Sequence, residues 1–131
     1  MKIFGQSFHK AGDNLYVSQD NIRFTYSDGD ENERKLLEVT NSAQDLSSLS
    51  LELHQNGQSW IDRYHFSMHR GAIIRCLPFS LDARVLEIGA GCGAVTRALA
   101  EKFAQVDAIE GSLKRARICS SRCRDLENVR V

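Results

Sequence analysis

The sequence predicts an α/β fold, in which helices flank a parallel sheet and a smaller α+β region precedes it. The main observation is the apolar run Arg84–Ile88, which reads as a buried strand and leads directly into a loop with glycine at positions 89, 91 and 93. Apolar residues at helical spacing follow, and then a second apolar run, Gln105–Ile109. Short strands alternating with helices are typical of a parallel sheet. We therefore divide the chain into an N-terminal region, residues 1–57, and an α/β part, residues 58–131.

The composition indicates one folded domain of ordinary size. The chain has 131 residues, of which 42% are hydrophobic and 26% charged, as in globular proteins. Lys plus Arg balance Asp plus Glu at 17 each, so no overall field favours binding to nucleic acid or to an anionic membrane. The sequence has neither a signal-peptide pattern nor an apolar run long enough to span a bilayer. We expect a cytoplasmic protein.

The N-terminal region, residues 1–57, predicts small strands and then helices. Strand-like pieces cover residues 2–4, 14–17 and 21–26. A turn at 27–30 precedes a helix over residues 31–43, whose apolar face holds Leu36, Leu37 and Val39. A further short helix, capped within residues 45–48, ends at Gln55 before the break at Asn56 and Gly57. No chemistry is assigned to this region.

Residues 59–77 predict one long amphipathic helix that Pro78 ends. Its expected apolar stripe consists of Trp60, Ile61, Tyr64, Met68, Ala72, Ile73 and Cys76. His65 and His69 are four residues apart, which is the spacing of two metal ligands on a helix. However, the H-E-x-x-H pattern is absent and there is no third ligand, so we predict no metal site and interpret the pair as solvated or hydrogen-bonding.

The segment after the glycines predicts the rest of the sheet. A helix over residues 94–103 leads to the strand Gln105–Ile109, which ends at Glu110, about 20 residues past the glycines, as expected of a ribose-binding acid. A third helix covers residues 112–125, and a third strand begins at 129. The third helix has a basic face, which we attribute to solvation, made of Lys114, Arg115, Arg117, Arg122 and Arg124.

The four cysteines indicate reduced thiols. They form no C-x-x-C pair and no zinc-finger spacing. Cys119 and Cys123 are four residues apart on a predicted helix, where they would face the sheet as small apolar side chains. Cys92 lies in the glycine loop.

The acidic residues around the loop favour a ligand without phosphate. Gly89, Gly91 and Ala94 also fit the dinucleotide pattern G-x-G-x-x-A. Glu87, however, would repel a pyrophosphate on the loop, whereas it suits a ligand with an ammonium or sulfonium group. S-adenosylmethionine is such a ligand, and its ribose suits Glu110.

The motif V-L-E-I-G-A-G-C-G-A-V-T, followed by V-D-A-I-E-G-S, resembles the first two motifs of the class I S-adenosylmethionine-dependent methyltransferases. The resemblance covers residues 84–131 and implies a Rossmann-like sheet. It implies that Glu110 holds the ribose and that the methionine side lies on the loop. The cofactor-binding residues expected are Glu87, Gly89, Ala90, Gly91, Gly93, Glu110 and Gly111, with Tyr64 or Arg70 at the methionine carboxylate. The segment Y-H-F-S-M-H-R-G also resembles methyltransferase modules attached to bacterial surface-glycan glycosyltransferases.

The sequence departs from this family in its extent. Family members usually have a seven-stranded sheet, whereas these residues supply the first three strands, truncating the sheet after the third. The first strand would then present an open apolar edge. We therefore expect a fragment, or a sheet completed by a second copy or by another chain.

The sequence is compatible with three functions. The leading one is a methyltransferase whose present chain holds the cofactor half; the methyl acceptor and the catalytic residue are not assigned, and His65 or His69 would act as a base only if the helix faces the pocket. The second is a non-catalytic module that docks through the open edge. The third, disfavoured by Glu87, is an NAD(P)-dependent oxidoreductase.

Overall fold

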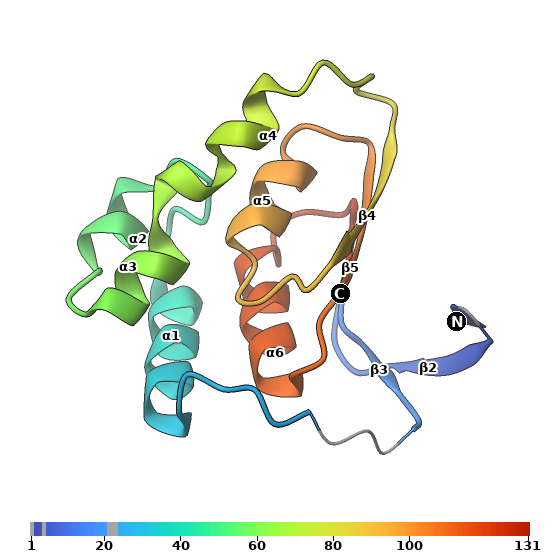
Figure 1. Ribbon diagram of the computed structural model, residues 1–131, viewed down its shortest axis with the longest axis horizontal. Helices are drawn as coiled ribbons and strands as arrows, with labels where there is room; N and C mark the ends of the chain where they lie inside the picture. Colours follow the sequence, from blue (N-terminus) through green and yellow to red (C-terminus); the bar gives the residue numbers. More distant parts are fainter. Residues whose placement is uncertain (1, 4, 21–23) are drawn as a thin grey trace.

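The computed structural model describes residues 2–3, 5–20 and 24–131. It is a mixed α/β structure with two sheets (Figure 1). The strands are β1 Lys2–Ile3, β2 Gln6–Lys10, β3 Tyr16–Ser18, β4 Arg84–Ile88, β5 Gln105–Ile109 and β6 Val129–Arg130. The helices are α1 Asp30–Ser42, α2 Leu51–Gln55, α3 Trp60–Phe66, the 3₁₀ helix η1 Met68–Gly71, α4 Ala72–Cys76, α5 Ala94–Ala100 and α6 Leu113–Arg122. No helix among the described residues has the length and apolarity that crossing a bilayer requires.

Strands β4, β5 and β6 form the predicted parallel sheet, in that order. The face that carries Val106 and Ala108 is buried, and α5 and α6 pack on its side, as Figure 1 shows. The prediction of a parallel sheet flanked by helices is therefore confirmed.

The opposite face of this sheet is open at β4, which corrects the prediction that residues 84–88 form a buried strand. Strand β4 lies at the edge of the sheet, and its burial alternates, with Leu86 47% and Ile88 78% exposed. Leu86 is in register with Asp107 and Ile88 with Ile109, so the exposed residues of β4 and the half-buried residues of β5 share one face. Apolar residues on both faces of β4 therefore do not mean that both faces are buried, because no described residues cover the second face of this strand.

The N-terminal strands form a small antiparallel sheet, β1-β2-β3, that joins the parallel sheet next to β6. The amide of Val131 donates to the carbonyl of Asn14 at 2.8 Å, and the amide of Tyr16 donates to the carbonyl of Val131 at 2.7 Å. The Asn14 side chain donates to the carbonyl of Cys123 at 3.2 Å. Strand β2 was not predicted. Of the predicted strand 21–26, residues 21–23 lie outside the described part, and residues 24–26 are not a strand.

The predicted helix over residues 59–77 is wrong, because the chain breaks at Ser67 into α3, η1 and α4. Ser67 has extended backbone angles (φ −63°, ψ 125°), and its hydroxyl caps the next turn by accepting from the amide of His69. The predicted stripe is wrong as well. Trp60 is 73% and Ile73 69% exposed, whereas His65 is buried. The helices do end before Pro78, as predicted.

Helix α6 packs against α1. Of the five basic residues, Lys114, Arg117 and Arg124 are exposed, as predicted, whereas solvation does not explain Arg115 and Arg122. Arg115 is only 6% and Arg122 only 1% exposed. The Arg122 guanidinium donates to the carbonyl of His65 at 2.8 Å. Arg124 donates to the carbonyls of Thr40 and Ala43, at the end of α1. These arginines therefore join α6 to the N-terminal helices. Cys119 and Cys123 are fully buried and face the core, as predicted.

Candidate functional site

The loop between β4 and α5 is a tight turn, and the amide groups of Gly89, Ala90 and Gly93 in it already have partners. Gly89, Gly91 and Gly93 have φ values of 81°, 59° and 84°, in the region that favours glycine. The amides of Gly89 and Ala90 both donate to the carbonyl of Ile109, at 2.8 and 3.1 Å. The amide of Gly93 donates to the carbonyl of Ala90 at 3.1 Å. These three amides are therefore not available to a phosphate.

Glu110 lies at the end of β5, directly beside this loop. One carboxylate oxygen accepts from the amide of Gly91 at 2.7 Å, and the other accepts from the amide of Ser112 at 2.8 Å. These bonds fix the orientation of the carboxylate. Because an ionised carboxylate has about four acceptor positions, two remain for a ligand with paired hydroxyl groups.

A cavity of about 440 Å³ lies at this edge of the sheet, within the usual size range of small-molecule sites. It brings together most of the residues that the sequence predicted. Those lining it are Tyr64, Arg70, Gly89, Ala90, Gly91, Glu110 and Gly111.

Two predicted residues, Glu87 and Gly93, do not line the cavity. The Glu87 carboxylate accepts from the hydroxyl of Thr96 at 2.6 Å, on the first turn of α5. Burial raises the pKa of Glu87, and the bond from Thr96 and the charge of Arg70 oppose this rise. Gly93 lies against α6, where its α-carbon packs on Cys119. Both residues therefore support the loop from behind.

Tyr64 of α3 and Arg70 of η1 also line the cavity. The Arg70 guanidinium lies 4.0 Å from the centre of the Tyr64 ring, and Trp60 stacks on the same ring at 5.4 Å. The break at Ser67 turns the chain between these two residues, so that both reach the cavity. The Arg70 guanidinium, held against the Tyr64 ring, is suited to bind a carboxylate of a ligand in this part of the cavity.

A charged cluster that the sequence analysis missed lies beside the cavity. The Asp28 carboxylate accepts from Arg115 and contacts Nε2 of His65 at 2.8 Å. Arg115 also donates to Glu33 at 3.3 Å, and Glu33 is only 2% exposed. His65 and Arg115 both line the cavity. One signal was present in the sequence, because Glu33 precedes Leu36 by three residues and so lies on the apolar face of its helix.

The two histidines of α3 and η1 lie in different environments. His65 is buried against Asp28, whereas His69 is exposed and makes an edge contact with His54 at 6.2 Å between ring centres. His69 does not line the cavity. Of the two candidates for a base, His65 is therefore the one at the site, and when Asp28 accepts from its Nε2, Nδ1 is the free acceptor of the ring.

We expect the His65 imidazole to titrate below its ordinary pKa of 6.5. Burial disfavours the cation, and Arg115 and Arg70 lower the pKa further, while the bond to Asp28 and its charge raise it. The folded state then binds fewer protons than the unfolded state, so stability falls as the pH drops through 6.5 towards the folded pKa. An NMR titration of the ring measures this pKa, and Asp28→Asn should lower it further. A value above the ordinary pKa would mean that the Asp28 charge outweighs burial.

Cys92, at the tip of the loop, is a neutral thiol. It lines the cavity but is only 3% exposed, and burial raises its pKa to about 12. The four cysteines are free, as predicted. Cys92 therefore contributes packing and not a thiolate.

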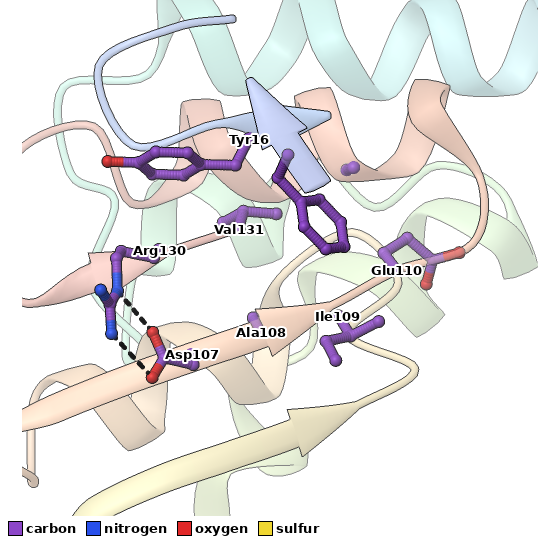
Figure 2. Close-up of a pocket in the computed structure, with 9 residues that line it drawn as sticks. Tyr16, Asp107, Ala108, Ile109, Glu110, Arg130 and Val131 are labelled. Atoms are coloured by element: carbon purple, nitrogen blue, oxygen red, sulfur yellow. Dashed lines mark hydrogen bonds and ion pairs between the residues drawn. The ribbon is translucent and has the colours of Figure 1, made fainter. Parts of the chain in front are cut away.

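Glu110 also lines a second, smaller hollow (Figure 2). Phe8 and Tyr16 of the small sheet line it together with Ala108 and Val131. The ion pair of Asp107 with Arg130 lies at one end. Its volume is about 60 Å³, room for a few water molecules.

No protein-family model matches the chain, and no curated protein or solved structure is detectably similar to it. The assignment of the site therefore depends on its residues and their geometry.

Proposed function

We propose that this chain is the cofactor-binding half of an S-adenosylmethionine-dependent methyltransferase with a Rossmann-like sheet. The observation that carries the proposal is the Glu110 carboxylate, which is held against the amide of Gly91 at the mouth of a cavity of about 440 Å³. The cavity lies beyond the carboxyl ends of β4 and β5, the usual position of ligands in open parallel sheets.

The loop favours a ligand that carries hydroxyl groups and no phosphate. A dinucleotide needs free amides on the loop for its pyrophosphate. Here Gly89, Ala90 and Gly93 donate to carbonyls, and Gly91 donates to Glu110. A pyrophosphate on this loop would therefore meet the Glu110 carboxylate and find these four amides already bonded. These contacts argue against the NAD(P)-dependent oxidoreductase.

The residues of the cavity divide between the two ends of the proposed ligand. Glu110 accepts from the ribose hydroxyls, and the Arg70 guanidinium pairs with the methionine carboxylate. Glu87, behind the loop, adds negative potential on the side of the sulfonium. The cofactor would supply an activated methyl group for in-line displacement, so the contribution of this chain is positioning. An acceptor that must lose a proton would need a base, and His65 is the residue with the position for it. We place the protein in the cytoplasm.

We expect Glu110→Gln to weaken binding of S-adenosylhomocysteine by roughly 10- to 100-fold. Each hydroxyl bond to a charged acceptor contributes on the order of 1.5–3 kcal/mol, and the amide keeps one acceptor oxygen for the backbone. Isothermal titration calorimetry measures the change. Glu127→Gln is the matched control, since Glu127 is exposed and does not line the cavity. Equal affinities for the two variants would remove Glu110 from the site.

A binding module is the second candidate function, and the open sheet favours it. Leu86 and Ile88 are exposed on β4, and Phe79 and Leu81 beside it are 62% and 65% exposed. Such a face would suit a second copy or another chain that completes the sheet. Light scattering after size exclusion tests this, because a monomer that melts cooperatively would argue against an obligate partner.

A further inference from the structure

Two aromatic side chains at the rim of the large cavity have no role in the function proposed so far. Residues 24–28, here called the aromatic segment, connect the small sheet to α1 without helix or strand. Phe24 and Tyr26 both line the cavity, yet they are 52% and 61% exposed. Large aromatic rings that face a cavity without being buried are positioned to contact a ligand.

Phe24 lies next to the carboxylate that is proposed to hold the ribose. Its ring packs on Gly111, so closely that a Cβ atom at that position would come within 2.8 Å of Phe24 Cδ2. Gly111 directly follows Glu110. The absence of a side chain at this position therefore lets the ring approach the end of β5.

The aromatic segment is anchored to the body of the protein. The Arg115 guanidinium carbon lies 4.4 Å from the centre of the Tyr26 ring. Asp28 accepts from Arg115 and contacts His65, both of which are buried. Tyr26 is consequently held at the cavity by Arg115, and Phe24 packs on Gly111, so that ordering these rings costs little on binding.

We infer that Phe24 and Tyr26 form the adenine end of the cavity, with the purine stacking on Phe24. This inference rests on the proposed function. A base attached to a ribose at Glu110 needs an apolar surface within a few ångströms, and Phe24 supplies it. The other hollow beside Glu110, at about 60 Å³, does not hold a purine, because it has room for only a few water molecules.

The test compares S-adenosylhomocysteine with adenosine, using calorimetry on the full chain. Phe24→Ala should weaken both ligands by the same factor, about tenfold, since stacking on one ring is lost. Phe24→Trp should keep the affinity. Arg70→Gln should weaken S-adenosylhomocysteine and leave adenosine unchanged, because adenosine has no carboxylate. Phe79→Ala is the matched control, because Phe79 is a phenylalanine that is 62% exposed beside β4 and lies outside the cavity.

The possible outcomes distinguish a failure of the proposed cofactor from a failure of the proposed adenine site. If the unaltered chain binds neither ligand, the proposed cofactor fails, and the adenine site fails with it. If it binds S-adenosylhomocysteine and Phe24→Ala binds equally well, the inference is wrong and the function stands. Tighter binding by Phe24→Ala also overturns the inference, because the ring would then be blocking the site. Thermal melts verify that each variant is folded.

Discussion

Replacing Gly93 with alanine is expected to lower the free energy of unfolding by about 2 to 5 kcal/mol. Gly93 has a φ of 84°, which costs a residue with a side chain about 1 to 2 kcal/mol. Its Cβ would also lie 2.9 Å from the Cα of Cys119 and 3.0 Å from its sulfur, in the buried interface of α5 and α6. Because backbone cannot rotate away as a side chain does, overpacking adds about 1 to 3 kcal/mol. Urea unfolding measures the loss.

Gly89→Ala is the matched control for this clash. Gly89 has nearly the same φ, 81°, but no atom lies within 4 Å of the Cβ position. It should lose only the backbone contribution, about 1 to 2 kcal/mol. Equal losses in the two variants would show that helix α6 does not press against the loop as described.

Replacing Arg115 with methionine is expected to cost about 3 to 5 kcal/mol, because it removes the cation from a buried cluster. The Arg115 side chain is only 8% exposed and pairs with Asp28 and Glu33, whose side chains are 15% and 2% exposed. One oxygen of Glu33 already has no hydrogen-bond partner among the described residues. Without Arg115, the carboxylates of Asp28 and Glu33 would stay buried but would lose the cation that pairs with them. Chemical denaturation measures the change.

Arg117→Met, two residues further along α6, is the control. Arg117 is exposed, and no ion pair involves it in the described part of the chain. Its replacement should change stability by no more than about 0.5 kcal/mol. A similarly small effect at Arg115 would mean that the cluster contributes no more than surface charges do.

The sequence predicted the sheet better than it predicted the helices. Strands β4 and β5 follow from short apolar runs next to glycines, a signal that depends only on neighbouring residues. The break at Ser67 has no such signal, because a single extended residue interrupts a pattern that is otherwise helical on both sides. The exposure of Leu86 depends on what covers the sheet, and the strand's own sequence does not encode this.

The loop and Glu110 were predictable for a related reason. A glycine turn and an acid at the end of the next strand meet wherever two parallel strands are neighbours, so the spacing alone places them together. Phe24 reaches the same cavity, and Asp28 and Glu33 pair with Arg115 beside it, from more than 50 residues before the loop and Glu110 in the sequence. Their approach depends on α1 packing against α6, which no local pattern reveals.

The central claim is that the cavity holds an adenosyl sulfonium cofactor, and direct titration tests it. Trp60, the only tryptophan, stacks on Tyr64 at the cavity wall, so its fluorescence reports on a ligand there. We predict that S-adenosylhomocysteine and S-adenosylmethionine change this fluorescence saturably and raise the melting temperature, whereas NAD does neither. Binding of NAD without a response to S-adenosylhomocysteine would contradict the account.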